Sequence, residues 1–184
     1  MTNQSLRKDI QFRFNGETLY LSAVTFSAWN KMRTDILKIE SESFSSSLAD
    51  TEETLHELVN SPTAIFLAFS VPPSNGLVAY IAADLLEGFP DIPGVTSDPH
   101  FGKKDSIYVA SVAVLRDWRG YGVGTTLMRQ CLRAALHKGI KRATAHIDTG
   151  STSRIQLTMK VLKSFPNWYG TGRMFDYVEM ITEV

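Results

Sequence analysis

Three glycines that alternate with other residues follow an arginine in the middle of the chain, as Arg119-Gly-Tyr-Gly-Val-Gly-Thr125. Residues 106–115, just before, are apolar and β-branched, which predicts a strand, and residues 127–136, just after, have helical spacing. A helix N-terminus presents free N–H groups and partial positive charge, and glycines let a ligand approach the backbone closely. We therefore interpret this stretch as a phosphate cradle rather than as a tight turn alone.

The charge that follows the glycines agrees with an anionic ligand. Residues 119–147 include no Asp or Glu, but they include six basic residues: Arg119, Arg129, Arg133, Lys138, Lys141 and Arg142. Such a local excess attracts anions, although a solvated helix face accounts for some of these residues. The whole chain has 19 basic and 19 acidic residues and zero formal net charge. This balance argues against a nucleic-acid partner.

The remaining composition indicates one globular domain. The chain has 184 residues, of which 43% are hydrophobic and 21% are charged. Cys131 is the only cysteine, so we expect a small core residue and neither a disulfide nor a cysteine-based metal site. No apolar run is long enough for a membrane span, and the N-terminus has no secretion signal. We therefore expect a cytoplasmic protein with no membrane partner.

The pattern along the chain predicts a mixed α/β (α+β) fold in a single domain over residues 1–184, with 1–9 as a tail. The strand over 106–115 is apolar on both faces and should be central in the sheet. The loop over 88–105 is long enough to be functional or mobile. The other expected elements are a hairpin over 10–24 around Asn15-Gly16, helices over 27–43 and 51–59, strands over 64–70 and 77–87, the helix ending near His137, a strand over 142–147, a helix from a capping box at Ser153 to Lys163, and a strand over 175–181.

Two common phosphate-binding motifs do not fit the glycines. A P-loop needs a lysine directly after its last glycine, and none is present. In a dinucleotide fingerprint, Thr125 or Leu127 would stand at the third glycine, and the first acidic residue after the glycines is Asp148. A nicotinamide-dependent enzyme is therefore a poor match.

The pattern Arg119-x-x-Gly122-x-Gly124 resembles the R/Q-x-x-G-x-G/A motif of the GCN5-related N-acetyltransferase (GNAT) family. The resemblance extends over residues 106–137 and the strand that follows, and the order of the N-terminal elements agrees. It implies a central, mostly antiparallel sheet with a splayed motif strand and flanking helices. It also implies acetyl-CoA as co-substrate. The implied contacts are the pyrophosphate on the amides of Arg119, Gly120, Tyr121, Gly122, Val123, Gly124 and Thr125, and the pantetheine along Val112, Ala113 and Val114.

The resemblance further implies that a primary amine of a small molecule or peptide attacks the thioester carbonyl directly. The amine must lose a proton, and the developing oxyanion needs a donor, for which a backbone N–H near Val112 or Val114 is suited. The leaving thiolate needs a proton or a positive neighbour. A homodimer is left open.

The group that removes the amine proton is not clearly marked. Tyr108 and Ser111 are candidates, and we expect them on opposite faces of the central strand. Glu40 and Glu42 stand near the end of the first long helix, and we interpret them as a solvated helix end. Asp148 is interpreted as the cap of the next turn. A water chain to solvent is a further alternative.

The acid for the thiolate is also open. Many family members carry a tyrosine in the last helix, and at that register this chain has Lys160. Lys160 could place a positive charge near the sulfur, or it could simply lie on the polar face of a helix. Tyr169 is a second candidate. Because the usual tyrosine is missing, a non-catalytic acyl-CoA-binding module on the same fold is the alternative function.

Overall fold

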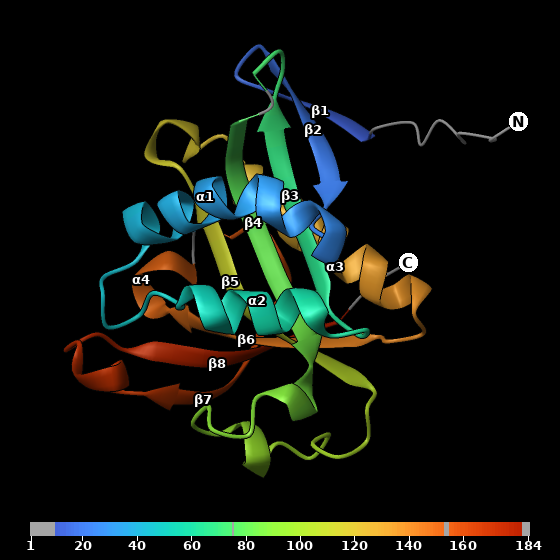
Figure 1. The fold of residues 1–184 in the computed structure, drawn as a ribbon. Coiled ribbons are helices and arrows are strands. Elements are labelled where there is room, and N and C mark those ends of the chain that lie inside the picture. Colours follow the sequence, from blue (N-terminus) through green and yellow to red (C-terminus); the bar gives the residue numbers. More distant parts are fainter. Residues whose placement is uncertain (1–9, 75, 153–154, 182–184) are drawn as a thin grey trace, which may run out of the picture.

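The computed structural model describes residues 10–74, 76–152 and 155–181, and within these ranges one eight-stranded sheet carries helices on both faces (Figure 1). Along the sheet the strands follow the order β1-β2-β3-β4-β5-β6-β8-β7. The strands are β1 (Ile10–Phe14), β2 (Glu17–Ala23), β3 (Ile65–Val71), β4 (Gly76–Leu85), β5 (Ser106–Val114), β6 (Arg142–Asp148), β7 (Lys160–Phe165) and β8 (Phe175–Ile181). The α-helices are α1 (Phe26–Ser43), α2 (Glu52–Asn60), α3 (Val123–His137) and α4 (Thr149–Thr152). Residues 1–9, expected as a tail, lie outside the described residues.

The N-terminal elements form as the sequence predicts. Asn15 and Gly16 have positive φ angles of 48° and 83° and join β1 to β2, because such a two-residue turn matches the twist of a hairpin. Thr25 and Thr51 cap α1 and α2, and each side chain accepts a hydrogen bond from a backbone N–H of the first turn. These caps fix where both helices begin, against the same face of the sheet.

The strands are antiparallel to their neighbours except at one place, between β5 and β6. That parallel pairing joins only Ser106–Val109 to Arg142–Ala145. Further along, β5 stays with β4 while β6 stays with β8, so the two strands diverge (Figure 1). The expected central, splayed strand in a mostly antiparallel sheet is confirmed.

A β-bulge lies at Ala110 in β5. Tyr108 pairs with Asp84, Val109 pairs with Ala83, and Ser111 pairs with Ala82, so Ala110 is the extra residue. The extra residue shifts the alternation of side chains by one position. Tyr108 and Ser111 therefore lie on the same face of the sheet, and the expectation of opposite faces is wrong.

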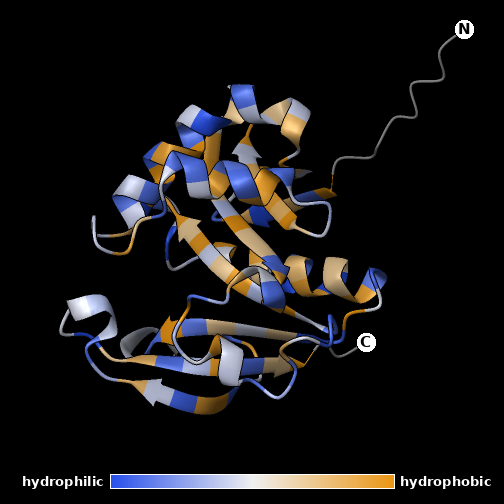
Figure 2. Ribbon diagram, turned by 60° about the horizontal axis from the view of Figure 1, so that its bottom comes forward, coloured by the Kyte–Doolittle hydropathy of each residue, from blue (hydrophilic) through white to orange (hydrophobic). Residues whose placement is uncertain are grey.

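Two main apolar clusters fill the space between the sheet and its helices. The cluster under α3 includes Ile81, Val109, Leu127 and Cys131. The cluster under α1 and α2 includes Trp29, Ile36, Leu55 and Tyr80. Figure 2 shows apolar residues gathered along the central strands, with hydrophilic residues interspersed along the helices.

Cys131 is fully buried, and burial raises the pKa of its thiol to about 12. It is thus a core residue, as expected, because so weak an acid supplies almost no thiolate at neutral pH.

The C-terminal part differs from the expectation. Residues 160–165 are not the end of a helix but form β7, which pairs antiparallel with β8. Helix α4 is short and ends at Thr152, and the expected cap at Ser153 lies outside the described residues. Strand pairing determines the structure here despite the local helical pattern, because the backbone N–H and C=O groups of β7 find partners on the edge of β8. The alignment that put Lys160 in place of a helical tyrosine therefore has no structural basis.

No described helix is both long enough and apolar enough to cross a membrane.

Candidate functional site

A cleft of about 1100 Å³ opens where β5 and β6 diverge. One end of its lining is the glycine stretch at the start of α3, and the other end is a group of aromatic side chains. The middle is the edge of β5 from Val109 to Val112. A ligand in the cleft would therefore touch the backbone of β5 and a helix N-terminus at once.

The glycines leave the N-terminus of α3 open toward the cleft. Gly120 and Gly122 both have φ angles of 83°, a region that favours glycine, and a Cβ atom at either position would meet no atom within 4 Å. Gly122 caps α3 without a side-chain hydrogen bond. The amide of Thr126 donates to the Gly122 carbonyl at 2.9 Å, so the amides of residues 123–125 precede the first helical bond. They can donate to an anion.

Gly124 has a different role from the other two glycines. It lies inside the helix, and a Cβ atom there would stand 3.5 Å from Cγ2 of Val114 and 3.8 Å from Cγ1 of Val112. Both distances are ordinary van der Waals contacts, so the first turn of α3 packs directly on β5 and has room for a small side chain at this position. The positions of the helix amides and of the strand edge are fixed relative to each other by this packing.

Arg119 braces the site from the side of α1. Its Nη2 lies 3.3 Å from the Glu42 carbonyl and 3.2 Å from Oγ of Ser43, and its Nε donates to the Val114 carbonyl at 2.7 Å. The side chain thus joins the end of α1 to the end of β5. Arg119 lines the cleft, whereas Tyr121 is 48% exposed and is not among the described lining residues.

The three residues expected to pair with pantetheine point in two directions. Val112 and Val114 line the cleft. Ala113 is 1% exposed and packs in the cluster under α1 and α2. Beyond Val109 no described strand pairs with the β6-facing edge of β5. Apart from the Val114 carbonyl, which accepts from Arg119, this edge can pair with an extended ligand.

The aromatic end of the cleft is centred on Tyr108 and His146. The Tyr108 hydroxyl lies 3.0 Å from Nδ1 of His146. The imidazole stacks between Trp168 and Tyr177, at centroid distances of 4.2 and 4.7 Å. Burial lowers the pKa of His146 to about 4, although the Pro93 carbonyl opposes this effect. The imidazole is therefore neutral at pH 7.

Tyr169 and Lys160, the two candidates for the acid, have different surroundings. Tyr169 lines the cleft and is 52% exposed, in a short 3₁₀ turn over Trp168–Gly170. Its φ angle of 45° is unusual for a residue with a side chain. Lys160 is exposed at the start of β7 and is not among the described residues that line the cleft.

Glu40 is buried, so its interpretation as part of a solvated helix end is wrong. It is 2% exposed and accepts hydrogen bonds from the Tyr80 hydroxyl and, at 2.7 Å, from the Asp50 amide. Ser111, which lines the cleft, is 3.1 Å from the Tyr80 hydroxyl. Asp148 fits its expected role, since its Oδ1 accepts from the Gly150 amide at 2.8 Å.

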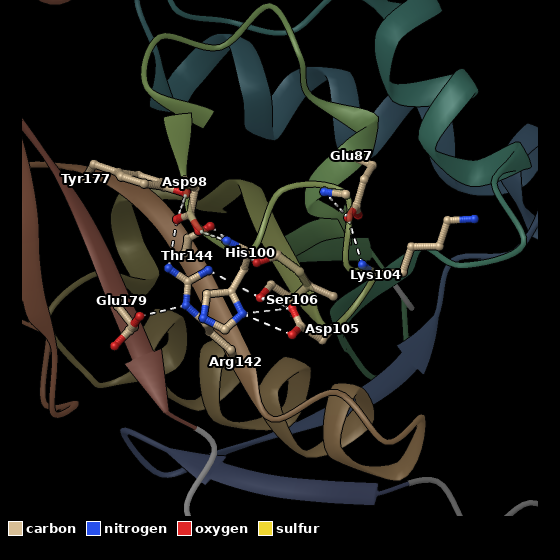
Figure 3. A network of polar contacts seen from close by, with 12 residues as sticks. Glu87, Asp98, His100, Lys104, Asp105, Ser106, Arg142, Thr144, Tyr177 and Glu179 are labelled. Carbon is tan, nitrogen blue, oxygen red and sulfur yellow. Dashed lines mark hydrogen bonds and ion pairs between the residues drawn. The ribbon is translucent and has the colours of Figure 1, made fainter. Parts of the chain in front are cut away.

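Polar contacts hold the segment over residues 86–105, as Figure 3 shows, and those of Asp98 with Arg142 and Tyr177 are buried. Asp98 Oδ2 accepts from Nη2 of Arg142 at 2.7 Å and from the Tyr177 hydroxyl at 2.8 Å. Burial alone would raise the pKa of Asp98, but the hydrogen bond from Arg142 and other contacts lower it overall. Phe89 and Ile92 of this segment line the aromatic end of the cleft. The long loop thus contributes a fixed wall.

Sequence analysis did not single out two residues of this site. Tyr80 lies in an apolar strand and His146 in a short alternating strand, and both patterns predict only packing. Their partners come from other strands, so no local signal pointed to either residue. Among the described residues, no group of three or more His, Cys, Asp or Glu side chains could hold a metal ion.

Solved structures of acetyltransferases share this fold over about nine tenths of the chain. A ribosomal-protein-S18-alanine N-acetyltransferase from Escherichia coli has 10% identity and a TM-score of 0.66, and the match covers 90% of this chain and 95% of that one. NAA60 from Arabidopsis thaliana, in complex with acetyl-CoA, has 12% identity, a TM-score of 0.66, and coverage of 89% and 98%. An aminoglycoside 6'-acetyltransferase type Ii has 15% identity, a TM-score of 0.66, and coverage of 89% and 97%.

A comparison with curated protein sequences finds no match. The model of the acetyltransferase (GNAT) family matches residues 29–162, which include most of α1, the glycine stretch and the diverging strands. The resemblance stated from the glycine motif is therefore confirmed, and the chain belongs to the GNAT family of acetyltransferases.

Proposed function

We propose that the protein transfers an acetyl group from acetyl-CoA to a primary amine by direct attack in a ternary complex. The observation that carries the proposal is the divergence of β5 and β6 beside the open N-terminus of α3. One cleft thus offers a strand edge and anion-binding amides, which match the amide-bearing and phosphate-bearing parts of acetyl-CoA.

The pyrophosphate would bind at the glycine stretch. The free amides of residues 123–125 and the positive end of α3 favour negative charge. Gly120 and Gly122 leave space for phosphate oxygens, because neither has a neighbouring atom where a Cβ would stand. Arg119 would add positive charge at the rim of the cleft, next to its brace on Val114.

The pantetheine would pair with the free edge of β5 at Val112–Val114, which directs the thioester toward the bulge at Ala110. A backbone N–H near Val112 would then donate to the oxyanion that forms when the amine attacks. A fixed backbone donor is suited to this role, because it needs no reorganisation as the charge develops.

The amine acceptor would enter at the aromatic end, beside Tyr108, His146 and Tyr169. The Tyr108 hydroxyl and Nδ1 of neutral His146 share a hydrogen bond, and in either direction the hydroxyl oxygen keeps a lone pair that can accept a hydrogen bond from the amine. Tyr169, at the exposed mouth, is the remaining candidate for proton donation to the thiolate. Relatives are named for protein and aminoglycoside acceptors, so a small molecule and a peptide both remain acceptors of this proposal.

The test combines binding and turnover in one sample. Acetyl-CoA is titrated by calorimetry with NADH as the control, and pooled amines are then added while free thiol is measured. Acetyl-CoA binding with amine-dependent thiol release supports the transferase. Binding without release from any amine would instead identify an acyl-CoA-binding module, and no binding would contradict both functions.

A further inference from the structure

Glu40 is a buried carboxyl that forms no ion pair with a cation in the described part of the chain. It is 2% exposed, and none of the ion pairs formed by the described residues includes it. Its contacts are the Tyr80 hydroxyl, the Ser111 hydroxyl and the Asp50 amide. A buried carboxyl without a cation is costly when ionised and tends to take up a proton. Packing alone therefore does not account for a carboxyl at this position next to the cleft.

A continuous set of hydroxyl groups links Glu40 to the cleft. Ser111 lines the cleft, and its Oγ lies 3.1 Å from the Tyr80 hydroxyl and 3.5 Å from Oε2 of Glu40. The Tyr80 hydroxyl in turn donates to Oε2 of Glu40. Each hydroxyl can accept one proton while it donates another, so the set can pass a proton without moving a side chain.

The bulge at Ala110 places this set where the reaction would occur. By shifting the alternation of β5, it turns Ser111 toward the face that carries Tyr80 and Glu40 while Val112 turns to the other face. Ser111 is thus next in sequence to the backbone proposed to stabilise the oxyanion. Without the extra residue, Ser111 and Tyr108 would be on opposite faces.

We propose that Ser111, Tyr80 and Glu40 form a proton relay that takes the proton from the attacking amine. The relay rests on the proposed acetyl transfer. When the neutral amine attacks, the C–N bond forms, the π electrons of the carbonyl move to its oxygen to give the oxyanion, and the nitrogen becomes positively charged. One N–H proton passes to Ser111 Oγ as Ser111 gives its proton to Tyr80 and Tyr80 gives its proton to Glu40. The oxyanion then re-forms the carbonyl as the C–S bond breaks, its electron pair leaves with the sulfur, and the thiolate takes a proton from Tyr169.

Glu40 is a better final acceptor than His146, the imidazole at the aromatic end of the cleft. Burial raises the pKa of Glu40 above its ordinary value, whereas burial lowers the pKa of His146 to about 4. The titratable groups that face Glu40 are Tyr80 from β4 and Asp50 from the segment before α2, and the negative charge of Asp50 adds to the rise. After the product leaves, protonated Glu40 returns its proton through Ser111 to the open cleft.

The test is Glu40→Gln, with Glu57→Gln on the exposed face of α2 as the matched control. Gln keeps the size of the side chain and can still accept from the Asp50 amide, but it cannot take up a proton. We expect kcat to fall about 100-fold, in the range typical of a lost general base, with the dissociation constant of acetyl-CoA unchanged. The titration of Glu40 should also disappear from the acid limb of the pH–rate profile. Glu57→Gln should match the wild type in all three.

Two further measurements separate the relay from a structural role. Tyr80→Phe, which breaks the middle link, should lower kcat about tenfold and leave acetyl-CoA binding unchanged. Infrared spectra recorded across the acid limb should show a carboxyl that is protonated at low pH and ionised at the pH of maximal kcat, and Glu40→Gln should lack this change. If Glu40→Gln releases thiol at the wild-type rate with an unchanged pH profile, the relay is overturned and the acetyl transfer is not. No thiol release from wild type with any amine would overturn the acetyl transfer and the relay together.

Discussion

Nε of Arg119 donates a 2.7 Å hydrogen bond to the carbonyl of Val114, five residues earlier. The same guanidinium lies 3.2 Å from Oγ of Ser43 at the end of α1. Arg119 therefore fixes the end of β5 against α1 while its own backbone begins the glycine stretch. The motif arginine has a structural role in addition to its charge.

Arg119→Ala should weaken acetyl-CoA binding about tenfold, because it removes both the hydrogen bond that holds the end of β5 and the positive charge at the rim of the cleft. The free energy of unfolding should fall by about 1 kcal/mol at most, since the side chain is exposed. The control is Arg116→Ala, an exposed arginine of the preceding turn. Calorimetric titration of both variants with acetyl-CoA checks this prediction. Equal affinities would show that the contacts of Arg119 do not support the binding site.

Gly122→Glu should abolish measurable acetyl-CoA binding, because it puts bulk and negative charge at the proposed pyrophosphate site. Gly139 offers a close control at the other end of α3. Its φ angle is 82°, against 83° for Gly122, and a Cβ atom there also meets nothing within 4 Å. Gly139→Glu should therefore cost similar backbone strain, about 1 kcal/mol, and leave binding intact. Equal loss of affinity in both variants would point to strain rather than to a phosphate site.

His146 should make the protein less stable as the pH falls. Its pKa is about 4 in the folded protein and about 6.5 in the unfolded chain, so only the unfolded chain takes up a proton between these values. The free energy of unfolding should then fall by about 2–3 kcal/mol from pH 7 to pH 4 through this group. Denaturation of His146→Phe across this range should show a smaller fall, whereas exposed His137→Gln should follow the wild type. An identical pH dependence in all three proteins would refute the assignment.

Arg142→Met should be strongly destabilising, by about 3–5 kcal/mol, because it leaves the buried carboxylate of Asp98 without its cation. Arg33→Met is the control, since its ion pair with Glu52 is exposed and should contribute less than about 1 kcal/mol. Thermal denaturation of the two variants gives the comparison. A loss in Arg142→Met no larger than in Arg33→Met would show that the segment over 86–105 does not depend on this contact.

The sequence predicts this fold well where the local signal and the long-range packing agree. The turn at Asn15-Gly16, the cap at Thr51 and the start of α3 all depend on residues close in sequence, and all form as expected. The helix expected to end at Lys163 failed for the opposite reason. Its spacing suits a helix, but pairing with partners in β8 that are ten or more residues away in the chain determines the structure.

The candidate site was predicted only where its groups belong to one segment. The glycine stretch can be recognised directly in the sequence, because the groups that would bind the ligand are backbone amides of one segment. The bulge at Ala110 leaves no such signal, so Tyr108 and Ser111 were assigned to the wrong faces. Glu40 and Tyr80 are 40 residues apart, and only the packing of α1 on the sheet brings them together.

Ligand binding in the cleft between β5 and β6 would also make the abundance of this protein depend on its ligand. A ligand that pairs with the free edge of β5 binds only the folded chain, and a 100-fold excess over its dissociation constant adds about 2.7 kcal/mol to the free energy of unfolding. Fewer molecules are then unfolded and open to proteases at any moment. A cell rich in this ligand would keep more of the protein, so its supply would set the amount of enzyme as well as the rate of turnover.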